Sequence, residues 1–488
     1  MSVMHTRELR IDGGMAAVFA ATAEKAHAFF LESALPADGL GRYSFIGFGP
    51  LAVFRVAAGG AAEVTWADGR VERTEGEPLE ELRKLHGRIG AEFGQDLQEG
   101  QDSEKERVPF AGGAVGFFSY EFGLRFEGVK RTSADDLAVA EAEWAFYDGV
   151  VVCEEASGSV FVATNRRHKG EAEKVLARIE REVRAALAGE HAEVGETERS
   201  GVGGRGGKAE IAANFSREGY VRAVGRVKEF IRSGDVYQIN LSQRFETVMP
   251  CAAAELYRKL RKQSPAPYGC FLNFGGVQVA GVSPERFLRV EGEAVTTRPI
   301  KGTRPRGRDA GEDAALKAEL AVSEKDRAEL LMIVDLERND LGRVCVPGSV
   351  RVENLYALEA HPTVWHQVAE VSGRLAEGRD VFDCIRAAFP GGSITGAPKI
   401  RAMQIIDELE PHRRHLYTGA MGYLGFDGRA ELNIAIRTIT CVGGRAYFHA
   451  GGGVVWDSDP ESEYAETLTK AKALRAALTQ AGAGGVRS

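Results

Sequence analysis

One lysine stands among three arginines in the segment Thr297–Gly307, which reads TRPIKGTRPRG and is typical of a strand that ends in a Pro/Gly turn. An exposed lysine has a pKa of about 10.4, and neighbouring cations lower that pKa because they repel the added proton. Arg298, Arg304 and Arg306 are therefore expected to make Lys301 easier to deprotonate. Because a neutral amine is a nucleophile, Lys301 is a candidate for covalent catalysis. The alternative for an isolated cluster of this kind is a basic surface loop.

Carboxylates lie on two further segments that have helical spacing. In Glu324–Arg343 the side chain of Glu329 lies among apolar residues, and in Asp457–Leu478 Glu463 and Glu466 are i and i+3 neighbours on one face. The predicted buried face of the first segment consists of Leu330, Leu331, Val334 and Leu336. Mg²⁺ binds one or two carboxylates and completes its shell with water or substrate oxygens, so two such helices are a candidate metal site.

Spacing alone leaves a second interpretation of these acids open. Glu466 and Lys470 are i,i+4 neighbours and fit an ordinary surface ion pair.

Two glycine-rich loops are candidate anion-binding elements. Phe389–Lys399 reads FPGGSITGAPK, with Ser393 or Thr395 available to cap a following helix, and His449–Ser458 reads HAGGGVVWDS. Backbone N–H groups in such loops bind anions without side chains. Neither loop matches a Walker or dinucleotide-binding pattern, and a purely structural role is the alternative for each.

Composition limits the class of protein. The 488 residues are 44% hydrophobic and 27% charged, which predicts a globular protein with a large core. A net charge of -8 argues against nucleic acid or an acidic membrane as the main partner, and no transmembrane run or signal peptide is recognisable, so a cytoplasmic protein is expected. The six scattered cysteines contain no C-x-x-C pair and are expected to be free thiols.

The elements that must position these residues alternate between helices and short strands without a regular βαβ order, which predicts an α+β layered-sheet fold. A hairpin is expected from Ala145–Glu154 and Ser159–Thr164, and another within 267–290, with Glu285 at the end of its second strand. We divide the chain into an N-terminal region at 1–188, a Gly-rich linker at 189–207 and a catalytic region at 208–488. Amphipathic helices are predicted at Leu79–Phe93, Lys169–Ala188, Ser216–Ser233 and Ala252–Gln263.

Seven segments in order resemble the chorismate-utilising enzymes, a family that includes the large subunits of anthranilate and aminodeoxychorismate synthases, isochorismate synthases and salicylate synthases. They read GDVYQINLSQR, GVSPERF, PIKGTRPRG, AELLMIVDLERNDLGR, GGSITGAPKIRAM, IAIRT and AGGGVVWDSDPESEYAET. The resemblance covers nearly the whole chain and is strongest over 234–474. It implies a two-layered antiparallel β-sandwich flanked by helices, with the active site between the layers.

The resemblance also implies a set of site residues. Mg²⁺ is expected on Glu329 and Glu466, with Glu463 and Asp326 close by, to hold the ring carboxylate of chorismate. Arg437 and Tyr417 match the residues that bind the enolpyruvyl carboxylate, where a guanidinium can donate two parallel hydrogen bonds. The remaining matches are His366, near the substrate ring, and the backbone of Gly302, Thr303, Gly452 and Gly453.

Two positions indicate the branch of the family. Members that add water carry a lysine where this chain has Gln238, and anthranilate synthases usually have alanine where it has Lys301. Lysine at that position resembles the aminodeoxychorismate synthases, which implies that Lys301 adds to the ring while Glu285 protonates the departing hydroxyl. None of the six cysteines lies in a G-x-C-x-G turn, so ammonia is expected from a separate glutamine amidotransferase subunit.

A regulatory pocket is a further implication of the resemblance. Ser33, Pro267 and Tyr268 match the tryptophan pocket of anthranilate synthases, whereas Gly269 replaces the methionine usual there. We therefore expect a vestigial or structural tryptophan site.

Overall fold

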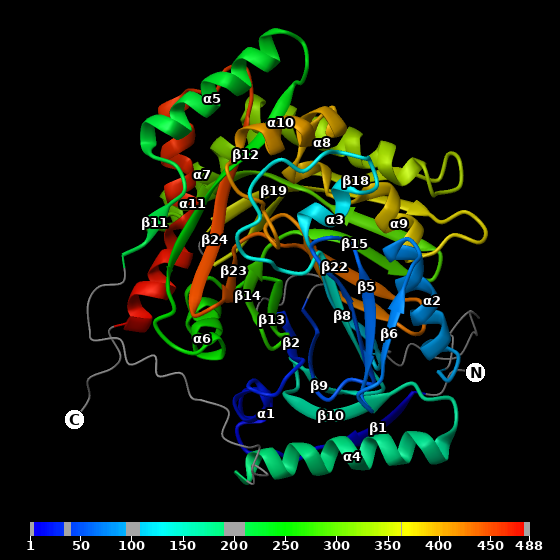
Figure 1. Cartoon of the computed structure of the whole chain (residues 1–488). Helices are drawn as coiled ribbons and strands as arrows, with labels where there is room; N and C mark the ends of the chain where they lie inside the picture. The colour runs from blue at the N-terminus through cyan, green and yellow to red at the C-terminus, as the bar shows by residue number, and fades with distance from the viewer. Residues whose placement is uncertain (1–3, 34–40, 94–107, 190–209, 363, 483–488) are drawn as a thin grey trace.

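Two large sheets face each other in the computed structural model, which describes residues 4–33, 41–93, 108–189, 210–362 and 364–482 (Figure 1). Neighbouring strands in both sheets run antiparallel. In order across the first sheet, the strands are β1 (His5–Glu8), β10 (Ser159–Thr164), β9 (Val150–Glu154), β3 (Tyr43–Gly47), β2 (Ala28–Glu32), β13 (Tyr268–Asn273), β14 (Val277–Ser283), β23 (Thr438–Val442), β24 (Arg445–Val454), β12 (Gln238–Val248) and β11 (Ala212–Ala213), with β20 (Gly396–Ala397) against β12.

The second sheet carries the lysine segment at one edge and N-terminal strands at the other. In order its strands are β17 (Ile300–Pro305), β19 (Val364–Arg374), β16 (Ala294–Arg298), β15 (Arg286–Glu291), β22 (Ala430–Ile434), β21 (Ala420–Gly425), β7 (Gly113–Phe118), β8 (Ala142–Tyr147), β4 (Ala52–Val56), β5 (Ala62–Trp66) and β6 (Val71–Thr74), with β18 (Arg351–Ala360) against β19.

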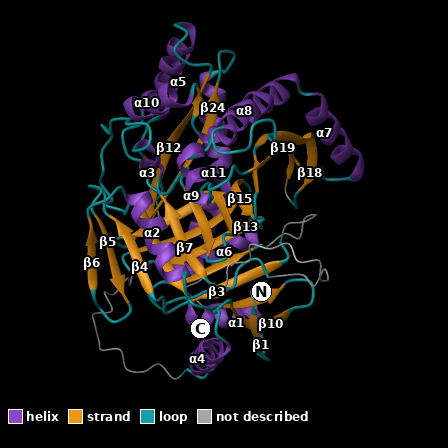
Figure 2. Cartoon of the chain, turned by 90° about the vertical axis from the view of Figure 1, so that its right-hand side faces the viewer, coloured by secondary structure: helices purple, strands orange, loops and turns teal. Residues whose placement is uncertain are grey.

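Helices cover the outer faces of both sheets, and apolar side chains fill the space between the sheets. Aromatic residues such as Phe29, Phe45 and Phe117 form the core between the sheets. Figure 2 shows α2 lying across the strands of the second sheet. The helices are α1 (Gly14–Thr22), α2 (Pro78–Gly90), α3 (Tyr120–Leu124), α4 (Lys169–Leu187), α5 (Arg217–Arg232), α6 (Ala253–Gln263), α7 (Ala310–Val322), α8 (Glu324–Gly342), α9 (Val381–Ala388), α10 (Lys399–Leu409) and α11 (Pro460–Gly482).

The predicted fold class is confirmed, since two layered antiparallel sheets are flanked by helices. Strands from both sides of the predicted linker join both sheets, for β2 pairs with β13 and β7 pairs with β21. All but the first residue of that linker lie outside the described residues, so the boundary stays a prediction.

The structure differs from the local predictions in four places. The predicted hairpin forms from Val150–Glu154 and Ser159–Thr164, but its first strand is shorter than expected, because residues 145–147 belong to β8 in the other sheet and the chain crosses between the layers at 148–149. Pro299 has no N–H, and it divides the lysine segment into β16 and β17. Leu331 is 43% exposed, whereas Leu330 and Val334 are buried as predicted, so the predicted buried face of α8 is only partly correct. Helix α10 begins after Pro398 without a side-chain cap from Ser393 or Thr395.

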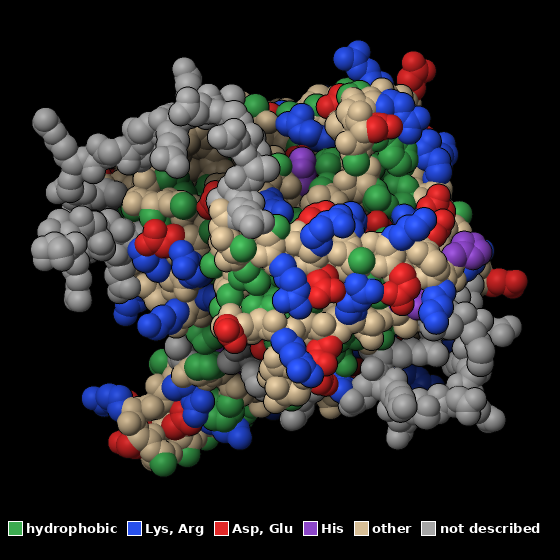
Figure 3. All heavy atoms as spheres, turned by 90° about the horizontal axis from the view of Figure 1, so that it is seen from below, with side chains coloured by type: hydrophobic (Ala, Val, Ile, Leu, Met, Phe, Trp, Pro, Cys, Tyr) green, Lys and Arg blue, Asp and Glu red, His purple; other side chains and the backbone are tan. Residues whose placement is uncertain are grey.

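Surface features agree with a globular, mixed-charge protein. Figure 3 shows Lys/Arg and Asp/Glu side chains interspersed on the face seen from below, where α4 lies in Figure 1. Ion pairs within α4, such as Arg178 with Glu182, account for part of this pattern. Among the described helices none is long and apolar enough to cross a membrane.

Candidate active site

The sequence motifs meet at one cavity of about 740 Å³. Its walls come from β17, the crossover before β15, β24, α8 and α11. The lining includes every residue predicted for catalysis, substrate binding and metal binding: Glu285, Lys301, Gly302, Thr303, Asp326, Glu329, His366, Tyr417, Arg437, Gly452, Gly453, Glu463 and Glu466.

Lys301 projects from β17 into this cavity. Its Nζ donates a hydrogen bond to the backbone oxygen of Ser393 at 3.0 Å. Burial lowers the pKa of Lys301, and the positive charge of Lys470 lowers it further, whereas the carboxylates of Glu285 and Glu329 oppose the shift. The amine is therefore easier to deprotonate than an exposed lysine, as a nucleophile requires.

The cause that the sequence suggested for this shift was wrong. The three arginines near Lys301 are neutralised by acids of their own and do not account for its lowered pKa. Arg298 pairs with Glu359 and Glu370, Arg304 with Glu319 and Asp326, and Arg306 with Asp313.

Glu285 lies on the crossover between the two sheets and is only 4% exposed. Its Oε1 has no hydrogen-bond partner among the described residues, and burial raises the pKa of the carboxyl. Lys301 opposes that shift through its charge, which places the two groups within electrostatic reach of each other. A carboxyl that stays protonated in a poorly solvated cavity is suited to act as a general acid.

His366 lies on β19 opposite Thr303 of β17, the strand that carries Lys301. Its Nδ1 lies 2.9 Å from the hydroxyl of Thr303, while its buried Nε2 has no partner in the described part of the chain. Burial lowers the pKa of His366 well below 6.5, and the charge of Arg437 adds to this effect. The imidazole is therefore neutral at physiological pH and can donate or accept one hydrogen bond.

Arg437 and Tyr417 both line the cavity, and Arg437 adds a positive charge to its wall. Across the described ranges, no hydrogen bond or ion pair holds the guanidinium of Arg437, so its donors are available to a ligand. The ring of Tyr417 stacks on His449 with centroids 4.9 Å apart and planes at 9°. This arrangement suits a carboxylate, which accepts two hydrogen bonds from a guanidinium.

Where Gly452 and Gly453 of β24 line the cavity, its wall is backbone without side chains. A side chain at Gly452 would come within 3.1 Å of Glu463 Oε2 and 3.4 Å of Glu466 Oε1, and one at Gly453 would overlap the amide of Gln238. That amide is fully buried and has no partner among the described residues. The backbone of β24 can therefore contact a ligand directly.

Acidic side chains from two helices face each other across the cavity. Glu329 belongs to α8, and Glu463 and Glu466 belong to α11. Burial raises the pKa of Glu329 and of Glu463, and the nearby charge of Glu466 adds to both shifts. Lys301 and Lys325 oppose the shift of Glu329, and Lys470 holds the pKa of Glu466 below its usual value. A bound cation would favour the charged form of all three acids.

No three His, Cys, Asp or Glu side chains of the described residues lie close enough together to form a metal site by themselves. An oxygen-only set of one carboxylate from each helix nevertheless fits Mg²⁺, which takes its other ligands from water or substrate. Glu329 and Glu466 are the residues that would hold it.

Two lysines complete the wall, and the sequence analysis did not include them in the site. Lys470 pairs with Glu466 at 2.7 Å, as the surface-pair interpretation expects, and both side chains are 49% exposed. Both also line the cavity, where Lys470 donates to the backbone of Gly451 at 2.9 Å. Lys325 lies 3.9 Å from Glu329 on α8. In the sequence each lysine is four residues from a predicted metal ligand, Lys325 from Glu329 and Lys470 from Glu466, and this spacing was the signal that could have placed them in the site.

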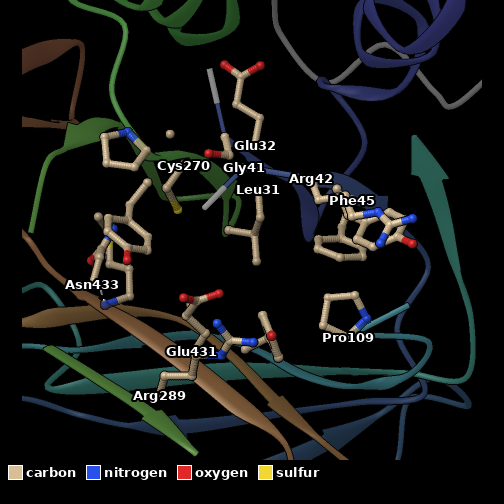
Figure 4. A pocket seen from close by; sticks show the side chains of 18 of the residues that line it. Leu31, Glu32, Gly41, Arg42, Phe45, Pro109, Cys270, Arg289, Glu431 and Asn433 are labelled. Carbon is tan, nitrogen blue, oxygen red and sulfur yellow. Dashed lines mark hydrogen bonds between the residues drawn. The ribbon is translucent and has the colours of Figure 1, made fainter. Parts of the chain in front are cut away.

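A second, smaller cavity of about 250 Å³ lies between the same two sheets. Ser33, Pro267 and Tyr268 all line it, as the predicted tryptophan-like pocket requires. Figure 4 shows Leu31 entering from the first sheet, while Arg289 and Glu431 approach from the second.

Known proteins resemble the chain over almost its full length. A family model described as chorismate binding enzyme matches residues 34–476. The chain is 38% identical over 454 residues to aminodeoxychorismate synthase component 1 of Bacillus subtilis, covering 93% of this chain and 92% of that protein. It is also 38% identical over 458 residues to anthranilate synthase component 1 of Streptomyces coelicolor, covering 93% and 84%.

A solved structure supports the same relationship. Anthranilate synthase component I from Streptococcus pneumoniae matches with a TM-score of 0.73 at 30% identity, covering 90% of this chain and 93% of that one. The family match includes every segment that lines the larger cavity.

Proposed function

The chain belongs to the chorismate-binding enzyme family, and we propose that it is the chorismate-aminating component of an aminodeoxychorismate synthase. In this proposal it converts chorismate and ammonia to 4-amino-4-deoxychorismate, the precursor of 4-aminobenzoate in folate biosynthesis. The observation that carries the proposal is the amine of Lys301, which projects into the cavity with a lowered pKa beside the protonatable carboxyl of Glu285.

Substrate binding uses the two ends of the cavity. Arg437 and Tyr417 are suited to bind the enolpyruvyl carboxylate through charged and phenolic hydrogen bonds. Mg²⁺, when bound by Glu329 and Glu466, would supply the positive charge that draws the ring carboxylate to the acidic wall. The two contacts fix the ring relative to Lys301 and Glu285.

The first chemical step joins Lys301 to the substrate. Neutral Nζ adds to ring carbon 2, the two ring double bonds shift, and the 4-hydroxyl leaves as water with the proton of Glu285. The new ammonium group of the adduct returns a proton to Glu285.

The second step releases the lysine. Ammonia adds at carbon 4, the double bonds shift back, and the bond between carbon 2 and Nζ breaks as Glu285 protonates the departing amine. The added ammonia nitrogen then loses a proton, so the sum is chorismate plus ammonia to aminodeoxychorismate plus water. Glutamine amidotransferase partners supply ammonia in this proposal, and the name component 1 borne by relatives favours a two-subunit enzyme.

The competing candidate is anthranilate synthase. The anthranilate synthase component 1 of Streptomyces coelicolor is as similar in sequence to this chain, at 38% identity, as the aminodeoxychorismate synthase component 1 of Bacillus subtilis. An anthranilate synthase would place the amine at carbon 2 and release pyruvate. Lysine at position 301 favours 4-amination, because a covalent lysine adduct at carbon 2 directs ammonia to carbon 4.

The proposal is tested with chorismate, Mg²⁺ and an ammonium salt at alkaline pH, followed by an aminodeoxychorismate lyase. The native protein should then yield 4-aminobenzoate. Lys301→Ala should slow the reaction markedly, with some direct amination remaining, and Lys301→Arg should be equally slow because it keeps the charge without a nucleophilic amine. Native rates in both variants would remove Lys301 from the mechanism.

A further inference from the structure

The crossover Ser283–Arg286 between β14 and β15 forms part of the wall of the larger cavity, through Pro284 and Glu285. The hydroxyl of Ser283 donates to the backbone oxygen of Ile434 at 2.6 Å, and the N–H of Ile434 donates to the backbone oxygen of Glu285 at 3.0 Å. These bonds tie the crossover to the end of β22. The larger cavity is on one side of this segment, where Glu285 lines it.

Arg286 lies on the other side, since successive side chains of an extended segment point in opposite directions. It is buried, and its Nε donates to the hydroxyl of Tyr268 at 3.0 Å and lies 3.4 Å from Glu431 Oε1. Its Nη1 lies 3.7 Å from Glu370 Oε2. Tyr268 and Glu431 both line the smaller cavity, so the guanidinium is fixed from that side.

Arg286 pairs with Arg298 of β16 and Asn433 of β22, and the regular pairing of β15 is interrupted directly after it. The register of β15 shifts after Arg286 on both sides, between Arg286 and Leu288 against β22 and between Arg286 and Arg289 against β16. A bulge of this kind leaves a residue outside the ladder and re-aims the side chains next to it. The buried side-chain contacts of Arg286 therefore add to the backbone bonds of the crossover in holding the segment next to Glu285.

We propose that Arg286 is a positioning residue that sets the aim of the Glu285 carboxyl by anchoring the crossover to Tyr268, Glu431 and Glu370. The inference rests on the proposed function in one respect, namely that Glu285 is the acid. Arg286 itself does not line the larger cavity among the described residues and does not touch substrate.

Arg286→Gln is the primary test, with steady-state kinetics measured as loss of chorismate by chromatography. We expect kcat to fall about tenfold to a hundredfold, because a misplacement of about 1 Å can cost as much, while KM for chorismate changes less than about threefold. Arg286→Lys should recover part of kcat, and Tyr268→Phe, which removes one hydroxyl, should show a smaller loss of the same kind. Arg374→Gln, on the same sheet and paired with Glu293, is the matched control and should behave as native.

A crystal structure of Arg286→Gln gives a readout that needs no activity, and it should show the Glu285 carboxyl displaced relative to Lys301. Native kcat in the folded variant, a loss expressed mainly in KM, or an unmoved Glu285 would overturn the proposal. Where Arg286→Gln does not fold, Tyr268→Phe carries the same measurements. The identity of the product decides the proposed function separately, because chorismate loss is counted whichever amine forms.

Discussion

The two cavities between the sheets differ in how their charged groups are paired. In the larger one, the guanidinium of Arg437, one oxygen of Glu285 and one nitrogen of His366 have no partner among the described residues. In the smaller one, the acids and bases are matched within the protein. Glu32 accepts from Tyr257 at 2.7 Å and pairs with Arg261 at 2.8 Å.

The same matching holds for the other charges of the smaller cavity: Arg42 pairs with Glu154, Arg289 with Glu291 and Glu431 with Arg286. Groups left unpaired at low exposure carry a desolvation cost that a ligand can relieve, whereas paired groups gain little from a ligand. The comparison therefore assigns the chemistry to the larger cavity. It predicts strong effects of substitution or ligand there and weak effects in the smaller cavity.

The largest effect is expected at Glu285. Burial raises its pKa, so it keeps its proton to higher pH than an exposed glutamate, and activity should fall as pH rises through that pKa. Activity should rise with pH on the other limb as Lys301, whose pKa is lowered, becomes neutral. Glu285→Gln should reduce kcat by about 10²-fold to 10⁴-fold and abolish the descending limb in a pH–rate profile. A variant that retains this limb would contradict the assignment of the acid.

The acidic wall should show the next largest effect. Glu329→Gln and Glu466→Gln should each reduce turnover by about 100-fold, because metal charge stabilisation contributes several kcal/mol. Calorimetric titration with Mg²⁺ in the presence of chorismate should show weakened binding in both variants. Glu461→Gln, in the first turn of the same helix and paired with Arg217, serves as the control. Unchanged Mg²⁺ dependence in both wall variants would remove the metal assignment.

Two arginines, the unpaired Arg437 and the paired Arg429, allow the effect of pairing to be tested with the same substitution. Arg437→Lys keeps the charge but loses the two-pronged hydrogen bond, so KM for chorismate should rise about tenfold to a hundredfold in initial-rate measurements. Arg429→Lys is a matched control, because Arg429 already donates two hydrogen bonds to Asp427 within the protein. Equal KM values for the two variants would mean that the unpaired guanidinium does not bind substrate.

The smaller cavity should show the weakest response. L-Tryptophan would have to compete with existing ion pairs for its charged groups, so we expect binding only in the millimolar range and little inhibition. Isothermal calorimetry with the native protein measures this directly. Micromolar binding with loss of activity would show that the ion pairs of the smaller cavity do not prevent tryptophan from binding there. The absence of any binding heat at millimolar L-tryptophan would mean that the cavity is not a tryptophan site.

Periodicity predicted most of the elements because the buried faces repeat as expected. Helices α4, α5 and α6 formed within one residue of their predicted bounds. The predictions failed where tertiary contacts determine which sheet a strand joins or which face of a helix is buried. The chain changes sheets at Asp148–Gly149, a turn dipeptide, but only the tertiary pairing shows that the segments on either side of it join different sheets. The exposure of Leu331 likewise depends on which side of α8 meets the second sheet.

For the site, residue types were predictable and their electrostatics were not. The motifs identified Lys301 and Glu285, yet the lowered pKa of Lys301 arises from burial and from Lys470, which is 169 positions away in the chain. The arginines near it in sequence are each paired with an acid, and one of these acids, Asp326, lines the same cavity. Short-range sequence cannot show such pairing, because neighbours on a strand face opposite sides.

The central claim is that Lys301 directs amination to carbon 4 of chorismate and leaves the enolpyruvyl group intact. Pyruvate released per chorismate consumed, measured with ammonia and Mg²⁺ in a lactate dehydrogenase-coupled assay, tests it most directly. The account predicts consumption of chorismate without pyruvate and without fluorescent anthranilate. One pyruvate for each chorismate, with anthranilate as the product, would contradict it and leave Lys301 as a charge that steers the substrate.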